Sequence, residues 1–166
     1  MNEVTTVHFF CGKMAAGKST LARKLAEENN AILLVEDEWL AHLFPDEIAT
    51  ISDYIKYAPR LKKVIFSHAI ALLSRGVSVV MDFPANTIEQ RQWFRGLFET
   101  AKVAHILHYL DVSDTVCKRQ LKERSKGKPE GSAFTTEAEF DAITQYFQPP
   151  SDNEGFNILI HKRESV

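Results

Sequence analysis

The sequence predicts an α/β fold, a three-layer αβα sandwich around a five-stranded, mainly parallel sheet. Three observations lead to this prediction. Five short apolar runs alternate with segments whose apolar residues recur at helical spacing, which is typical of strand–helix–strand crossovers. The second and third runs are almost wholly apolar, as expected for strands that helices cover on both faces. The length of 166 residues suits one core, so we expect residues 1–166 to form a single domain.

The strands are predicted from their composition. Residues 4–11 are rich in β-branched and aromatic side chains, and residues 31–35 read AILLV, both of which favour strands. Further apolar runs predict strands at residues 77–81, 104–110 and 157–161. Ligands of such sheets bind beyond the carboxyl ends of the strands. We therefore expect the residues that follow the first three strands to share one edge and to form the site.

The helices are predicted from apolar spacing and from end signals. Together these indicate helices at residues 18–28, about 61–75, 87–100, 113–125 and 136–147. Gly76 gives the longest of them a C-terminal stop signal. Thr87 with Gln90, and Thr136 with Glu139, have the spacing of capping boxes.

Composition and charge exclude several classes of protein. No apolar run approaches the ~20 residues needed to cross a bilayer, so no membrane partner is expected. The first residues lack the layout of a signal peptide, which favours a cytoplasmic location. A net charge of −2 gives no general attraction to long nucleic acids, although a short end held by local cations remains open. Cys11 and Cys117 are too few for a disulfide framework or a zinc site.

A glycine-rich segment follows the first predicted strand and begins the first predicted helix. Strand–loop–helix is the context in which the pattern G-x-x-x-x-G-K-[ST] binds a nucleoside triphosphate. Backbone N–H groups and the helix dipole hold the β-phosphate, Lys18 bridges the β- and γ-phosphates, and the Ser19 hydroxyl coordinates Mg²⁺. The sequence therefore predicts ATP and Mg²⁺ as cofactors, whereas the alternative is a glycine turn with a chance lysine. The predicted nucleotide-binding residues are Gly12, Lys13, Met14, Ala15, Ala16, Gly17, Lys18, Ser19 and Thr20.

The remaining motifs narrow the class. The chain has no N-K-x-D element of switch GTPases, and Phe83 rather than a glutamate follows Asp82, unlike in motor or AAA-type ATPases. It resembles the small P-loop kinases of the nucleoside-monophosphate-kinase-like fold, such as gluconate kinases, chloramphenicol phosphotransferase, zeta toxins and polynucleotide kinases. The resemblance covers nearly the whole chain in element order. It implies a P-loop NTPase sheet with strand order 2-3-1-4-5.

The same resemblance implies an activity. Such proteins are ATP-dependent phosphotransferases, so we expect the γ-phosphate of Mg-ATP to pass to a hydroxyl of a small molecule or of a nucleotide or oligonucleotide end. The expected partners are ATP and this hydroxyl-bearing substrate, whose identity stays open. The alternative is a nucleotide-binding regulatory protein or an NTPase without an acceptor.

Two aspartates match acidic positions of these kinases. Asp37 follows the second strand, where the resemblance implies a catalytic carboxylate that contacts the acceptor and takes its hydroxyl proton. The alternative is that Asp37 caps a helix starting at Glu38. Asp82 ends the third strand region, where the resemblance implies that it holds Mg²⁺ together with Ser19. The alternative is that Asp82 is a strand-end carboxylate that hydrogen-bonds to the next loop.

A basic helix precedes a polar loop in the second half of the chain. Lys118, Arg119, Lys122 and Arg124 resemble the lid of these kinases, which we expect at about residues 118–135. The resemblance implies that Arg119 stacks on the nucleotide base and that Arg124 neutralises the transferred phosphoryl group as a catalytic residue. The alternative is a solvated basic face.

The acceptor site is expected from the segments on either side of the third strand. Arg60 lies in the segment before it, where related kinases build their substrate sites. Asp82, Asn86 and Arg91 resemble the D-x-x-x-N…R pattern of polynucleotide-kinase and zeta-toxin-like proteins. We therefore predict that Arg60 and Arg91 bind the substrate. Aromatic residues in the same segments are more often part of a core.

Overall fold

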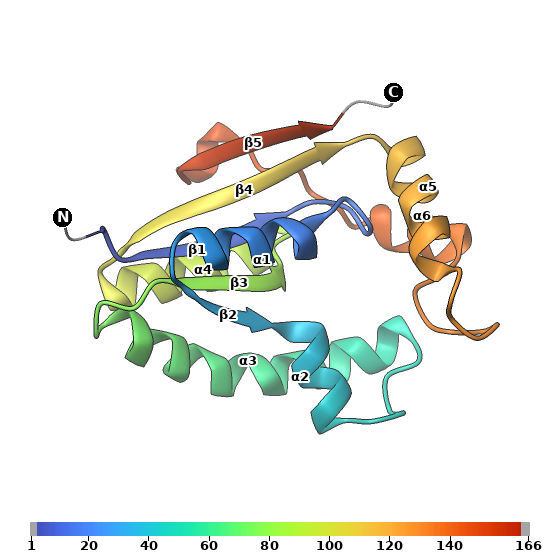
Figure 1. The fold of residues 1–166 in the computed structure, drawn as a ribbon, viewed down its shortest axis with the longest axis horizontal. Helices are drawn as coiled ribbons and strands as arrows, with labels where there is room; N and C mark the ends of the chain where they lie inside the picture. Colours follow the sequence, from blue (N-terminus) through green and yellow to red (C-terminus); the bar gives the residue numbers. More distant parts are fainter. Residues whose placement is uncertain (1–2, 164–166) are drawn as a thin grey trace.

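The centre of the molecule is a five-stranded sheet in the order β2-β3-β1-β4-β5 (Figure 1). The computed structural model describes residues 3–163, and every neighbouring pair of strands in its sheet is parallel. The predicted fold class and strand order are confirmed. The strands are β1 (Thr6–Cys11), β2 (Ile32–Val35), β3 (Val79–Pro84), β4 (Ala104–Val112) and β5 (Ile158–Arg163).

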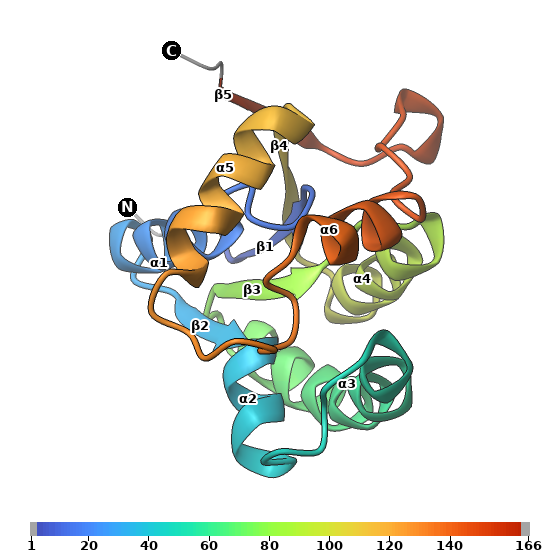
Figure 2. The ribbon, with the colours of Figure 1, turned by 90° about the vertical axis from the view of Figure 1, so that its right-hand side faces the viewer.

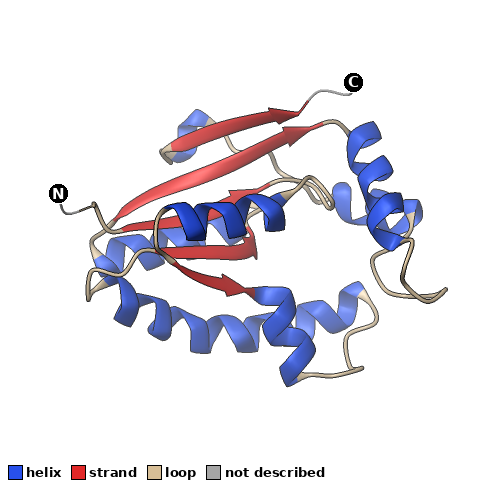
Figure 3. Ribbon diagram, in the orientation of Figure 1, coloured by secondary structure: helices blue, strands red, loops and turns tan. Residues whose placement is uncertain are grey.

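Helices cover both faces of this sheet (Figure 3). Those in the described residues are α1 (Lys18–Glu28), α2 (Glu36–Leu43), α3 (Ile51–Leu73), α4 (Ile88–Ala101), α5 (Asp114–Ser125) and α6 (Glu137–Thr144), with a short 3-10 turn, η1 (Asp152–Glu154). Helices α3 and α4 lie on one face, and α1 and α5 lie on the other (Figure 2). None of the helices within residues 3–163 is both long and apolar enough to cross a bilayer.

Adjacent phenylalanines of the central strand build the two halves of the core. Successive side chains of a strand point to opposite faces, so Phe9 packs with Ile65 of α3 and Phe94 of α4, while Phe10 packs with Val116 of α5. The Phe9 and Phe94 rings stack with their centroids 4.6 Å apart. All five side chains are buried, and this burial fixes the position of β1 and of the loop that follows it.

Some boundaries differ from those predicted. Strand β3 continues through Asp82 to Pro84, so this aspartate lies inside the strand rather than after it. Helix α2 begins directly at Glu36, with Val35 as its N-cap and no side-chain cap. The alternative role of Asp37 as a helix cap is therefore wrong. Three consecutive acidic side chains occupy the first turn of α2, where the positive end of the helix dipole stabilises them.

The predicted capping signals are confirmed in one case and half-confirmed in the other. Thr136 and Glu139 form a complete capping box at α6. Thr87 accepts a hydrogen bond from the Gln90 backbone at α4, but the Gln90 side chain accepts from the backbone of Asn86 instead of Thr87. The start of α4 is thereby tied to the end of β3, next to the site.

Candidate functional site

The loop after β1 needs glycine at two of its positions, for different reasons. Gly17 adopts φ 104° as the N-cap of α1, a left-handed geometry that glycine takes without steric cost. A Cβ at Gly12 would lie 3.2 Å from the Leu110 Cβ and 3.3 Å from the Leu110 carbonyl oxygen. This position therefore needs glycine because β4 lies so close. With no side chain capping α1, the first N–H groups of the helix are open to an anionic ligand.

The Lys18 ammonium group lies inside the curve of this loop. It donates a hydrogen bond to the Gly12 carbonyl oxygen. Burial lowers the pKa of Lys18, whereas the carboxylates of Asp82 and Asp37 raise it. The Arg124 charge lowers it further. The charges of Asp82, Asp37 and Arg124 therefore all act on Lys18, although the four residues belong to different elements.

Ser19 and Asp82 form a pair of oxygen donors at the same place. The Ser19 hydroxyl donates to the Asp82 carboxylate over 2.7 Å. Oxygen atoms of this kind suit Mg²⁺, which is held in proteins by one or two carboxylates together with substrate phosphates and water. Residues 3–163 contain no cluster of three or more His, Cys, Asp or Glu side chains able to hold a metal ion. The donor atoms of the Ser19–Asp82 pair are of the kind that holds a cation together with substrate phosphates.

These groups line one cleft of about 1060 Å³. Of the predicted site residues, Lys18, Ser19, Asp37, Asp82 and Arg124 all contribute to its wall. The wall also contains the rest of the phosphate-binding segment after Gly12, at residues 13–17 and Thr20. Other residues come from α2, α3, the start of α4, and the α5–α6 region.

Asp37 lies in this wall on the first turn of α2. Its side chain is exposed to the cleft, yet the surrounding protein raises its pKa by burial, and the charge of Asp82 raises it further. The charges of Lys18 and Arg124 oppose this shift. The charges of Lys18 and Asp82 therefore both act on the Asp37 carboxylate.

The cleft wall lacks four of the predicted residues, Gly12, Arg60, Arg91 and Arg119. Gly12 supports the loop from behind, because its N–H donates to the Asn86 side chain over 2.9 Å. Arg119 is exposed on α5, and its neighbour Gln120 lines the cleft instead. Arg60 is exposed on α3, with its guanidinium 5.3 Å from the centroid of the Tyr57 ring. The structure therefore does not bring Arg119 or Arg60 to the place that their predicted roles require.

Arg91 requires a correction. Its side chain is 0% exposed and forms an ion pair with Glu154, Nε to Oε1, at 2.8 Å. A second donor, Nη1, reaches the Ala85 carbonyl oxygen at 2.9 Å. The prediction that Arg91 binds substrate is contradicted, because the guanidinium is enclosed in the core. It anchors the segment before β5 to α4 and to the end of β3.

We expect loss of this buried ion pair to destabilise the fold strongly. Glu154→Gln leaves the Arg91 charge buried without a counter-charge, which costs about 3 kcal/mol. Urea unfolding of the variant measures this loss. Glu99→Gln is the matched control, because Glu99 pairs with Arg95 of the same helix at 3.6 Å but is 61% exposed, so its loss is below about 1 kcal/mol. Equal losses in the two variants would contradict the structural role of Arg91.

Contacts that the sequence did not reveal hold the phosphate-binding loop in place. The Lys13 ammonium forms an ion pair with Asp114 at the start of α5, with 2.5 Å between Nζ and Oδ1. It also lies 5.7 Å from the centroid of the Phe147 ring. Asn86, which the sequence placed near this edge, lies in the loop after β3 and accepts a hydrogen bond from the Gly12 N–H. The loop is thus tied to both sides of the cleft.

Comparisons with known proteins support the kinase-like fold. Residues 7–150 match the model of the AAA_33 family, described as an AAA domain. No curated protein gives a significant match. A solved structure from Chloroflexus aurantiacus J-10-fl, assigned as a candidate kinase, has a TM-score of 0.74 at 18% identity, and the match covers 96% of this chain and 89% of that one.

Two further solved structures give the same result. A sugar kinase from Janibacter sp. HTCC2649 has a TM-score of 0.62 at 16% identity, with 96% of this chain and 86% of that one covered. The APS kinase of Mycobacterium tuberculosis, in complex with AMPPNP and APS, has a TM-score of 0.59 at 20% identity, with 97% and 91% covered. The fold is therefore that of P-loop kinases. The family match and these neighbours confirm the predicted resemblance to the small P-loop kinases.

Proposed function

This chain belongs to the AAA_33 family of AAA domains, and from that premise we propose that it is an ATP-dependent phosphotransferase. It moves the γ-phosphate of Mg-ATP to a hydroxyl group of an acceptor. The single observation that carries this proposal is the cleft that Lys18, the Ser19–Asp82 pair and Asp37 all line. A pure nucleotide-binding site needs the first three of these groups but has no use for Asp37.

The size of the cleft supports two ligands. Pockets for one drug-sized ligand measure about 300–1,000 Å³, and this cleft measures about 1060 Å³. The phosphate-binding loop follows β1 and Asp37 follows β2, and β3 lies between these two strands in the sheet. A nucleotide on the loop therefore leaves room for an alcohol beside α2.

In this proposal, Asp37 accepts the proton of the acceptor hydroxyl as its oxygen attacks the γ-phosphorus. The bond between the γ-phosphorus and the β–γ bridging oxygen breaks, and ADP leaves with the electron pair. Lys18 and Arg124 neutralise the charge on the phosphate oxygens, which is the main contribution a protein makes to such a transfer. Ser19 and Asp82 would hold Mg²⁺, which when bound supplies further charge neutralisation at the β- and γ-phosphates.

A screen of alcohols tests the proposal directly. We expect ADP formation from Mg-ATP to rise when an acceptor is present among sugars, antibiotics, nucleosides and 5′-hydroxyl oligonucleotides, with one phosphorylated product per ADP. The alternative, an NTPase or regulatory nucleotide binder, predicts inorganic phosphate as the product whatever alcohol is added. That result across the whole library would overturn the proposal.

The segment between α5 and α6 is proposed to close over the bound ligands as a lid. The Lys118–Asp141 ion pair, with 3.0 Å between Nζ and Oδ1, joins the two helices. A Cβ at Gly127 or Gly131 of the connecting loop would meet nothing within 4 Å, and residues 126–131 are exposed. Figure 2 shows this loop joining the ends of α5 and α6. Closure of such a loop excludes water and completes the site.

We expect Mg-ATP to slow amide hydrogen exchange in residues 126–132. The reason is that closure orders a loop that has few packing partners in its open form. Exchange in β5 serves as the internal control and should not change. Equal protection of residues 126–132 with and without nucleotide would rule out the lid.

A further inference from the structure

Charge is distributed unevenly around the cleft. The lysines and the arginine in its wall, Lys13, Lys18 and Arg124, come from the phosphate-binding loop, α1 and α5. The part of the wall formed by α2 and α3, here termed the acceptor half, contains no lysine or arginine among its described residues. It consists of Glu36, Asp37, Ile51, Ser52, Tyr54 and Ile55.

Glu36 is the most unusual of these residues. Its side chain is 2% exposed, and the Tyr54 hydroxyl donates a hydrogen bond to Oε1 over 2.6 Å. Its other oxygen, Oε2, is buried and has no hydrogen-bond partner in the described part of the chain. Buried polar atoms of proteins are nearly always paired. Because Glu36 also lines the cleft, a ligand N–H or O–H group that enters the wall beside α2 would give this enclosed oxygen the partner it lacks.

The environment of Glu36 supports this interpretation. Burial raises its pKa to about 7, although the Tyr54 hydrogen bond and the charge of Lys62 oppose the shift. Burial makes the ionised form of Glu36 costly. A ligand that donates a hydrogen bond or carries a positive charge lowers this cost. An anionic ligand group at the same place would be repelled by the ionised forms of Glu36 and Asp37.

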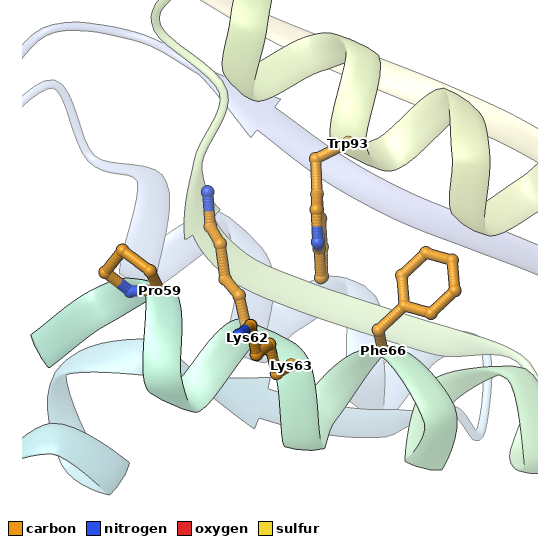
Figure 4. Close-up of a pocket in the computed structure, with 5 residues that line it drawn as sticks. All are labelled: Pro59, Lys62, Lys63, Phe66 and Trp93. Carbon is orange, nitrogen blue, oxygen red and sulfur yellow. The ribbon is translucent and has the colours of Figure 1, made fainter.

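The cations near the acceptor half do not make it a phosphate-binding site. The Lys62 ammonium lies 5.3 Å from the centroid of the Trp93 ring, in a separate hollow of about 360 Å³ between α3 and α4 (Figure 4). That hollow shares no lining residue with the cleft. Arg124 and Lys128 act on Asp37 electrostatically, but they come from α5 and the loop after it, the side assigned to the nucleotide.

We propose that the acceptor is an uncharged or amine-bearing alcohol without a phosphate group of its own, and that Glu36 recognises it by accepting a hydrogen bond from its N–H or O–H group. This inference rests on the proposed function, because it assigns the acceptor of the same transfer. Apolar parts of the acceptor pack against Ile51 and Ile55 of α3. Recognition by Glu36 is a specificity contact, while Asp37 remains the group that takes the proton.

Matched acceptors test the substrate class. The pairs are glucose with glucose 6-phosphate, glucosamine with glucosamine 6-phosphate, and adenosine with AMP, each measured for transfer from Mg-ATP, together with any alcohol found in the wider screen. We expect every accepted compound to be phosphate-free and its phosphate-bearing counterpart to react at least about tenfold more slowly. Preference for a phosphate-bearing member would overturn the inference and leave the kinase intact. Release of inorganic phosphate with every compound would instead overturn the proposed function.

A substitution at Glu36 tests the contact itself. Glu36→Gln keeps the size of the side chain but places an N–H donor or a neutral oxygen where the carboxylate oxygen was. We expect KM for the acceptor to rise by about 10- to 100-fold, the scale of one hydrogen bond to a charged group, with KM for ATP unchanged. We also expect the thermal midpoint of Glu36→Gln to lie at or above that of the parent protein, because the variant no longer buries a carboxylate.

Glu38→Gln is the matched control for this experiment. Glu38 is on the same turn of α2 and loses the same charge, but it is exposed and is not part of the cleft wall. We expect its acceptor KM to stay within about twofold of the parent value. An unchanged acceptor KM in Glu36→Gln, or equal changes in the two variants, would overturn the assignment of Glu36.

Discussion

Replacement of Lys18 by alanine is expected to remove productive binding of Mg-ATP while the protein stays folded. The ammonium group is the cation that the loop encloses, and it donates to the Gly12 carbonyl oxygen at the centre of the loop. Its contacts with phosphate oxygens would be charge-assisted hydrogen bonds, worth about 1.5–3 kcal/mol each. Loss of two such contacts weakens binding by about 10²-fold or more.

Calorimetric titration with Mg-ATP, alongside thermal unfolding, measures this effect. Alanine is a good helix former, and burial already lowers the pKa of Lys18, so removal of its charge costs the fold little. Lys24→Ala is the control on the outer face of the same helix, where Lys24 is 68% exposed and pairs only weakly with Glu28 at 3.8 Å. Unchanged affinity in a folded Lys18→Ala protein would contradict the assignment of the loop.

Asp37→Asn is expected to separate transfer from nucleotide binding. Asparagine keeps the size of the side chain but cannot take a proton from the acceptor. We expect phosphoryl transfer to fall by about 10²-fold or more, the usual contribution of general acid–base catalysis, with ATP affinity nearly unchanged. Kinetics with the acceptor, combined with nucleotide titration of the same variant, check both parts.

Asp82→Asn provides the contrast, because its proposed partner is the metal ion and not the acceptor. It should weaken Mg²⁺-dependent nucleotide binding as well as transfer. The pH profile adds a second signature. Since burial and the Asp82 charge raise the pKa of Asp37, the acid limb of the transfer rate should lie above the ordinary aspartate value of 3.8. Transfer by Asp37→Asn at the parental rate would contradict the mechanism.

The parts of the site that depend on local sequence were predictable. A complete phosphate-binding motif fixes eight consecutive positions, and its glycines occupy the backbone geometries that the motif requires, as Gly17 shows. The alternation of apolar runs and helices was enough for the fold class. The sequence also placed Asp37 and Asp82 at one sheet edge, because the carboxyl ends of parallel strands coincide there.

The parts that depend on distant contacts were not predictable. Arg91 has the spacing of a substrate residue, but Glu154, 63 residues away, draws its side chain into the core. Arg119 and Gln120 differ by one position, which turns a helical side chain by about 100° and decides which of them faces the cleft. The burial of Glu36 was not predictable either, because it depends on the long helix α3 and on the hydrogen bond from Tyr54, and no local pattern reveals that pairing.

The fate of the γ-phosphate is the most direct measurement of the central claim. Wild-type protein is incubated with ATP whose γ-phosphate carries a heavy-oxygen label, with Mg²⁺ and with the alcohol acceptor identified by the screen, and the products are weighed by mass spectrometry. Transfer by Asp37-assisted attack predicts that the label appears in the phosphorylated alcohol, in equal amount to ADP. Label found only in inorganic phosphate, with no dependence on the alcohol, would show a nucleotide hydrolase and contradict the proposed kinase.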